Sequence, residues 1–152
     1  MIWSPARSYP QTPGDQASGV SSTGVDEEHH LQAGLSAEIT LTVAESDTAI
    51  ALGSGDVPVL ATPRLVALCE EATVAAMAGQ IPEGSTSVGI RVEIEHMKPS
   101  VVGETVVARA TLVDVDARRL QFTTTVADAN GAAIAVARVW RVVVERDRFL
   151  DR

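Results

Sequence analysis

Apolar and polar residues alternate along five stretches of the chain, which is the pattern of half-buried strands. The five stretches span residues 35–43, 86–97, 104–115, 118–128 and 132–146. Between the last two lies Ala129-Asn130-Gly131, and an Asn-Gly pair between two alternating runs is a strong hairpin signal. We therefore predict five strands, of which the last four are antiparallel.

Between the first and second strands, residues 61–79 have the pattern of one helix that is apolar on nearly its whole circumference. A helix of this kind is normally buried. Thr62 is expected to cap its N-terminus, and Gly79 is placed to close its C-terminus. Glu70 and Glu71 nonetheless lie at its centre, and periodicity alone does not decide which of them points inward. A carboxylate in the middle of a buried helix is the first sign of a functional site.

The order of these elements predicts the fold. One helix cannot bury its whole circumference against one face of one sheet, so it must be wrapped by a curved sheet or covered by another subunit. We therefore predict an α+β hot-dog fold, in which a curved antiparallel sheet of about five strands wraps one long helix. Hot-dog proteins join sheets edge to edge, which also covers an exposed edge strand, so we expect a homodimer or higher homo-oligomer.

Composition divides the chain and limits its partners. Residues 1–32 are rich in Pro, Gly, Ser, Thr and Gln, which predicts a disordered leader before one domain over residues 33–152. The formal net charge of -8 argues against a surface for nucleic acid or for an anionic membrane. No apolar run approaches the length of a membrane span, and no signal segment stands at the N-terminus. We therefore expect a cytoplasmic protein.

The chain has one cysteine, Cys69. A single thiol permits no intramolecular disulfide and argues against thiol-based metal sites. Because Cys69 lies in the apolar helix, a packing role is favoured over a nucleophilic one. We expect neither a metal nor a redox cofactor.

The helix and the strand that follows it resemble a known family. The segments ATPRLVALCEEATVAAM and SVGIRVEIEHMKPSVVGETVVARATL are similar to those of hot-dog thioesterases related to fluoroacetyl-coenzyme A thioesterase, and the resemblance covers residues 33–149. In that family a threonine opens the helix, a glutamate follows eight residues later, and a histidine comes near the end of the next strand. Here these positions are Thr62, Glu70 and His96. The resemblance implies that they form the catalytic set for hydrolysis of an acyl-coenzyme A (acyl-CoA) thioester.

The three side chains also suit this chemistry by type. Thioester hydrolysis needs a nucleophile, donors for the developing oxyanion and a group that manages protons. Glu70 can act as nucleophile or base, and histidine exchanges protons near neutral pH. Thr62 brings a hydroxyl beside the free backbone N–H groups of a helix start.

Each of these residues also has a purely structural interpretation. Thr62 can serve only as a helix cap, and Glu70 can be a solvated helix residue. The strand's apolar phase, Val88-Ile90-Val92-Ile94, continues to His96, so this histidine can be a satisfied core residue. The joint pattern favours the functional interpretation.

Helix geometry predicts that the site is shared between two chains. Eight helical residues rise about 12 Å, so Thr62 and Glu70 of one chain should not contact the same substrate atom. Two antiparallel helices across a two-fold axis would bring the start of one near the middle of the other. We therefore expect a composite site at the dimer interface.

Coenzyme A carries phosphates, so positive charge should line its path. Lys98, two residues beyond His96 on the same strand face, and Arg64, in the first helical turn, are the candidates. Gly89 lies in the strand phase opposite to His96 and matches a glycine of the family. It can admit a ligand or the helix closely, or ease strand curvature.

The sequence differs from this family in one respect, and two alternative functions remain open. The fluoroacetyl-specific member has an aromatic lid before its helix, whereas the Gly/Pro loop at residues 53–60 has no aromatic residue, which leaves the acyl group open. The first alternative is a non-catalytic hot-dog module that binds acyl-CoA or a lipid-like ligand. The second, an acyl-CoA hydratase, ranks last because the Asp and His that such enzymes carry near the helix start are missing.

Overall fold

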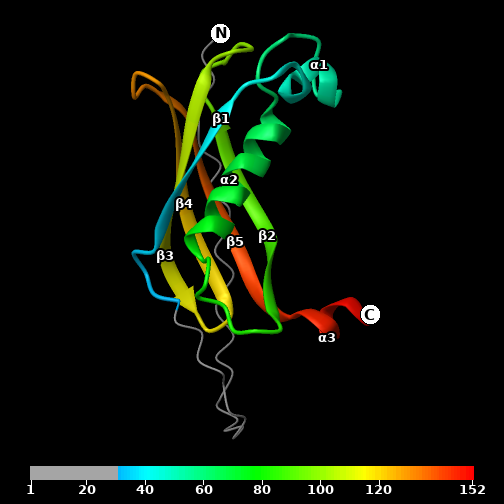
Figure 1. The fold of residues 1–152 in the computed structure, drawn as a ribbon, viewed down its shortest axis with the longest axis vertical. Coiled ribbons are helices and arrows are strands. Elements are labelled where there is room, and N and C mark those ends of the chain that lie inside the picture. The colour runs from blue at the N-terminus through cyan, green and yellow to red at the C-terminus, as the bar shows by residue number, and fades with distance from the viewer. Residues whose placement is uncertain (1–30) are drawn as a thin grey trace, which may run out of the picture.

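The computed structural model describes residues 31–152, in which five strands form one antiparallel sheet of order β1-β3-β4-β5-β2 (Figure 1). The strands are β1 Ser36–Thr42, β2 Ser85–His96, β3 Thr105–Asp116, β4 Arg119–Asp128 and β5 Ala133–Glu145. The five predicted strands are confirmed to within one residue at either end. Strands β1 and β2 are the two edges of the sheet.

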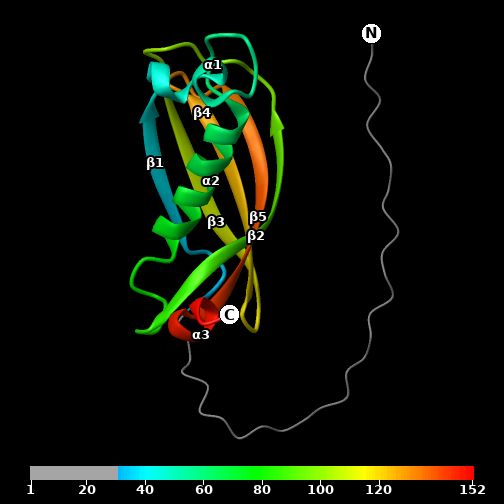
Figure 2. The same cartoon turned by 90° about the vertical axis from the view of Figure 1, so that its right-hand side faces the viewer.

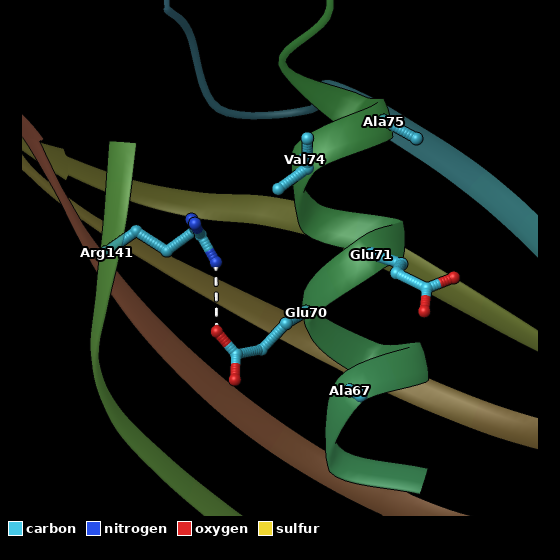
Figure 3. Close-up of a pocket in the computed structure, with 6 residues that line it drawn as sticks. All are labelled: Ala67, Glu70, Glu71, Val74, Ala75 and Arg141. Atoms are coloured by element: carbon cyan, nitrogen blue, oxygen red, sulfur yellow. Dashed lines mark hydrogen bonds and ion pairs between the residues drawn. The ribbon is translucent and has the colours of Figure 1, made fainter. Parts of the chain in front are cut away.

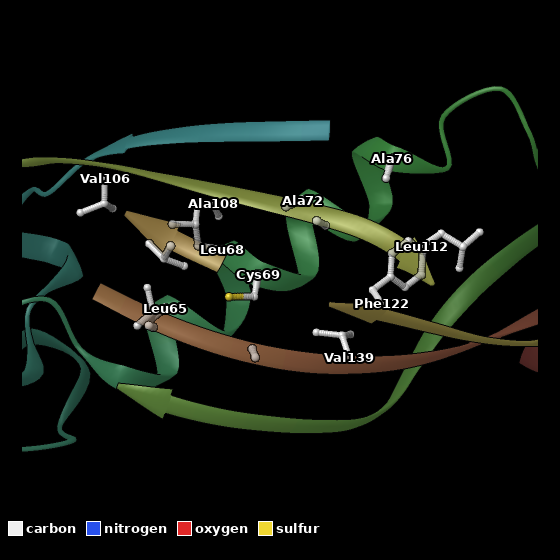
Figure 4. Close-up of a cluster of buried hydrophobic side chains, with 14 of the residues drawn as sticks. Leu65, Leu68, Cys69, Ala72, Ala76, Val106, Ala108, Leu112, Phe122 and Val139 are labelled. Carbon is white, nitrogen blue, oxygen red and sulfur yellow. The ribbon is translucent and has the colours of Figure 1, made fainter. Parts of the chain in front are cut away.

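The long helix, α2 (Thr62–Ala76), lies lengthwise against one face of the curved sheet (Figures 1 and 2). Its buried residues recur at the spacing of one helical face, and they are Leu65, Leu68, Cys69, Ala72, Thr73 and Ala76. Figure 4 shows most of these side chains packed against apolar residues of β3, β4 and β5. The core therefore lies between one side of α2 and the inner face of the sheet.

The opposite side of α2 is open. Ala67 and Glu71 are exposed, and Val74 retains 51% of its accessible surface. The sheet of one chain thus covers about one side of a helix that is apolar on most sides.

The ends of α2 differ from the prediction. Ala61 takes the extended backbone of the cap position (φ −70°, ψ 141°), and Thr62 is already the first helical residue, so its predicted capping role is wrong. Its hydroxyl instead bonds to His96. At the other end Met77 is the cap, and Gly79 follows with a positive φ of 76°, where the chain turns away.

A β-bulge in β2 changes which residues face the helix. The register of β2 against β5 shifts between Gly89 and Arg91, which leaves Ile90 unpaired and 48% exposed. A bulge inserts one residue, so the side chains before and after it exchange faces. The predicted common face of Val88, Ile90 and His96 is therefore wrong, and Gly89 lies on the side of His96, toward α2.

Three short helices were not predicted. They are the 3-10 turn Glu45–Asp47, α1 (Ala49–Leu52) and α3 (Arg146–Leu150). The predicted hairpin at residues 129–131 is confirmed, with Oδ1 of Asp128 accepting hydrogen bonds from the backbone of Asn130 and Ala132. None of the helices within residues 31–152 is long and apolar enough to cross a membrane.

The predicted leader lies outside the described residues except for its last two positions. One of these, Leu31, is 5% exposed and belongs to the core. The assignment of residues 1–30 as disordered stays a prediction.

Candidate active site

Thr62 and His96 meet where α2 begins and β2 ends. The Oγ1 atom of Thr62 lies 2.9 Å from Nδ1 of His96, and either group can donate the proton. The other ring nitrogen, Nε2, is buried and has no hydrogen-bond partner among residues 31–152. The Thr62 hydroxyl therefore holds the ring through Nδ1, and among the described residues Nε2 has no partner of its own.

Glu70 lies further along α2, beside a buried arginine of β5 (Figure 3). Nη1 of Arg141 donates to Oε2 of Glu70 at 3.2 Å, and Arg141 is 6% exposed. Arg141 also donates from Nε to the Ser87 hydroxyl at 2.9 Å and from Nη2 to the Ser87 carbonyl oxygen at 3.2 Å. Burial lowers the pKa of the Arg141 guanidinium, and the negative charge of Glu70 opposes that shift. A buried charge is stable only when it is paired and hydrogen-bonded, and Glu70 and Ser87 together meet both requirements for Arg141.

The absence of a side chain at Gly89 makes room for the Glu70 carboxylate. A Cβ atom at Gly89 would lie 2.5 Å from Oε2 of Glu70, closer than real Cβ contacts. The close approach predicted for this glycine is therefore made by the protein's own carboxylate.

An open groove of about 480 Å³ lies along the uncovered side of α2, beside Glu70 and Arg141 (Figure 3). The Glu70 side chain is 36% exposed. Its neighbour Glu71 also lines this groove, but its carboxylate points away from Arg141 and pairs with Arg64 (Figure 3). The structure thus distinguishes the two glutamates: Glu70 points toward the sheet and bonds to Arg141, whereas Glu71 bonds to Arg64.

Within one chain the three predicted catalytic residues form two separate groups. Thr62 bonds to His96, whereas Glu70 bonds to Arg141. Among the described residues no hydrogen bond joins Glu70 to either Thr62 or His96, and two turns of helix, about 12 Å, separate the groups. A single chain does not assemble the full set.

The two cations expected near coenzyme A already have carboxylate partners. Arg64 pairs with Asp47 at 3.0 Å and with Glu71 at 3.1 Å. Lys98 lies beyond the end of β2 and bonds to Asp128 at 2.9 Å, which raises the pKa of the lysine and lowers that of the aspartate. A phosphate that binds either cation would therefore have to share that cation with its carboxylate partner or displace the carboxylate.

Cys69 is fully buried in the core, directly before Glu70 in the chain. Burial, and secondarily the charge of Glu70, raises the pKa of its thiol to about 12. It is therefore a neutral thiol near neutral pH, in keeping with a packing role. No cluster of His, Cys, Asp or Glu suited to a metal ion occurs within residues 31–152.

Sequence reasoning missed Arg141 and Ser87. Arg141 occupies the inward phase of β5, between the buried residues Val139 and Val143. One arginine in an otherwise apolar phase was a usable signal, because a buried cation needs a buried or half-buried anion. Ser87 gave no such signal, since a serine on an edge strand is ordinary.

Comparison with known proteins places the chain in a family. The family of the fluoroacetyl-CoA-specific thioesterase, FlK, matches residues 43–147, a range that includes Thr62, Glu70 and His96. The chain belongs to this family. The predicted enzyme class, a thioester hydrolase, is thereby confirmed. No curated protein sequence matches the chain significantly.

Solved structures agree with this assignment. Fluoroacetyl-CoA thioesterase FlK superposes with a TM-score of 0.74 at 27% identity, over 80% of this chain and 93% of that one. A hot-dog-like protein from Thermanaerovibrio acidaminovorans gives 0.72 at 26% identity, over 79% of this chain and 88% of that one. A thioesterase superfamily member from Thermus thermophilus, at 21% identity, TM-score 0.74 and coverage of 79% and 88%, shows the fold alone. The predicted hot-dog fold is confirmed.

Proposed function

We propose that this protein hydrolyses an acyl-CoA thioester to a free acid and coenzyme A, using Thr62, Glu70 and His96. The FlK relatives support the substrate class, because FlK variants have been solved with acetyl-CoA and with fluoroacetate and CoA. The observation that carries the proposal is the Thr62–His96 pair, in which a buried imidazole nitrogen at the start of α2 has no partner within residues 31–152.

The residues have separate tasks in the proposed reaction. Water adds its oxygen to the acyl carbon, the C–S bond breaks, and the departing thiolate of coenzyme A takes up a proton. His96 manages these protons through Nε2, and Thr62 holds the ring from the other side. Glu70 either attacks the acyl carbon, forming an anhydride that water then cleaves, or removes a proton from the attacking water.

The proposed site is completed by a second copy of the chain. Joining two β2 edges about a two-fold axis would set two α2 helices antiparallel, with their uncovered sides facing each other. Glu70 of one chain would then approach Thr62 and His96 of the other. The open side of α2 and the free β2 edge support this arrangement, because each is a surface that a single chain leaves unpaired.

Coenzyme A enters the proposal as part of the substrate, and no metal or other cofactor takes part. Lys98 and Arg64 remain our candidates for its phosphates, each exchanging part of its carboxylate contact for a phosphate oxygen. Gly89 contributes by admitting the Glu70 carboxylate, which a Cβ at this position would crowd. The proposal does not specify which acyl group the substrate carries, since the loop at residues 53–60 has no aromatic residue.

The experiment that tests this function is release of free thiol from a panel of acyl-CoA esters, from acetyl to long chain, with His96→Ala as the comparison. Hydrolysis by the wild type that disappears in the variant would support the proposal and rank the acyl groups. Absence of hydrolysis with every ester, together with a ligand-induced rise in melting temperature, would overturn it in favour of a binding module.

A further inference from the structure

Arg141 makes more contacts than a simple ion pair with Glu70 requires. One of its nitrogens bonds to Glu70, and the other two bond to Ser87, through the hydroxyl and the backbone carbonyl oxygen. A guanidinium presents its donors in a rigid plane, so fixing two of them fixes the direction of the third. Ser87 therefore determines where Arg141 offers a hydrogen bond to the carboxylate.

The same arrangement distinguishes the two oxygens of Glu70. Oε2 bonds to Arg141, and the backbone at Gly89 lies close enough that a Cβ there would clash with it. Oε1 has no hydrogen-bond partner among residues 31–152, and Figure 3 shows the second oxygen directed away from Arg141. One oxygen is thus anchored and the other is left for chemistry.

We propose that Ser87 is a positioning residue, which acts through Arg141 to anchor Oε2 of Glu70 and to present Oε1 as the reacting oxygen. This inference rests on the proposed function, because it assigns a task within that reaction. Ser87 is on β2 and Arg141 is on β5, and the bulge at Ile90 leaves Ser87 and Gly89 on the face that meets α2. The strand pair therefore holds the anchor in a fixed relation to the helix.

The test compares Ser87→Ala with Ser87→Thr, which keeps the hydroxyl. We expect Ser87→Ala to lower kcat by about tenfold to a hundredfold with KM within about twofold, because misplacing a reacting group costs turnover rather than binding. Ser87→Thr should recover most of the loss. Ser85→Ala is the matched control, since this serine lies on the same strand with no side-chain bond to Arg141, and it should keep wild-type kcat.

A double-mutant cycle separates positioning from a general structural effect. If Ser87 acts through the carboxylate, Ser87→Ala should lower the residual rate of Glu70→Gln by less than about twofold, whereas independent effects would multiply. Should Ser87→Ala fail to fold, Ser87→Cys provides a second variant of similar volume with a weak acceptor.

The outcomes distinguish this inference from the function on which it rests. A wild type that hydrolyses no ester in the panel would overturn both. An active wild type with unchanged kcat in folded Ser87→Ala, or with effects that multiply in the cycle, would overturn the positioning role alone.

Discussion

The hydroxyl of Thr62 lies 2.9 Å from Nδ1 of His96, so the first residue of α2 is bonded to the last residue of β2. The threonine that the sequence pattern assigned to capping thus contacts the histidine, and Ala61 takes the cap position. This contact holds the imidazole through Nδ1, and Nε2 has no hydrogen-bond partner among residues 31–152. It also changes what a substitution at Thr62 should do.

Because Thr62 is not the N-cap residue, Thr62→Ala should lower the free energy of unfolding by less than the roughly 1 kcal/mol that is typical of a lost N-cap. Its effect should fall on turnover, since the imidazole loses the bond that orients it. We expect kcat to fall by about tenfold or more, as for other losses of catalytic geometry. Thr62→Ser, which retains the hydroxyl, should stay near wild type. Thermal unfolding and steady-state kinetics on both variants check this, and equal kinetics for Ala and Ser would contradict it.

Glu70→Gln should lower kcat by about a hundredfold or more, because an amide can neither attack the thioester nor accept a proton. The amide oxygen can still accept a hydrogen bond from Arg141, but the buried guanidinium loses its countercharge, so the free energy of unfolding should fall by about 1–3 kcal/mol. Glu71→Gln is the matched control, since Glu71 pairs with Arg64 on the outer side of the same helix. Kinetics and denaturant unfolding measure the two effects, and comparable kcat losses at both glutamates would show that the assignment is wrong.

Gly89→Ala should separate activity from stability. The added Cβ would lie 2.5 Å from Oε2 of Glu70, which is the far end of a flexible side chain and can move away. The shift should change the melting temperature little but displace the carboxylate, lowering kcat by about tenfold or more. Circular dichroism melting and kinetics on the same preparation test this, and wild-type turnover in Gly89→Ala would mean that the carboxylate position does not matter.

The strands were predictable because their period of two is a local property of the chain, whereas much of the site depends on contacts between distant residues. The bulge at Ile90 has no local signal beyond the neighbouring Gly89, yet it reverses the face of every residue before it. Arg141 becomes a site residue only because β5 pairs with β2 and α2 brings Glu70 opposite to it. The prediction that Thr62 caps the helix failed for the same reason, because its hydroxyl forms a hydrogen bond with His96, 34 residues away in the sequence.

The buried thiol of Cys69 predicts a loss of stability at alkaline pH. Its pKa rises from the ordinary 9.0 to about 12 in the folded protein. Between these values the unfolded chain releases the thiol proton while the folded chain keeps it, so the free energy of unfolding should fall as pH rises above 9.0. Cys69→Ala should show a shallower alkaline decline in denaturant titrations from pH 8 to pH 11. An identical slope in both proteins would mean that the thiol does not titrate differently on folding.

A site shared between two chains makes one prediction that a site within a single chain cannot meet. His96→Ala and Glu70→Gln should each be nearly inactive as homodimers. Co-expressed with different affinity tags and purified through both, they form heterodimers in which one site carries both substitutions and the other carries none. Such heterodimers should recover about half of the wild-type activity per dimer, since one of two symmetry-related sites is intact.

If each site instead drew His96 and Glu70 from the same chain, both sites of the heterodimer would be defective and activity would stay at the level of the homodimeric variants. Size-exclusion chromatography with light scattering on the same samples establishes that dimers are being compared, and a monomeric, fully active wild type would exclude the shared site altogether.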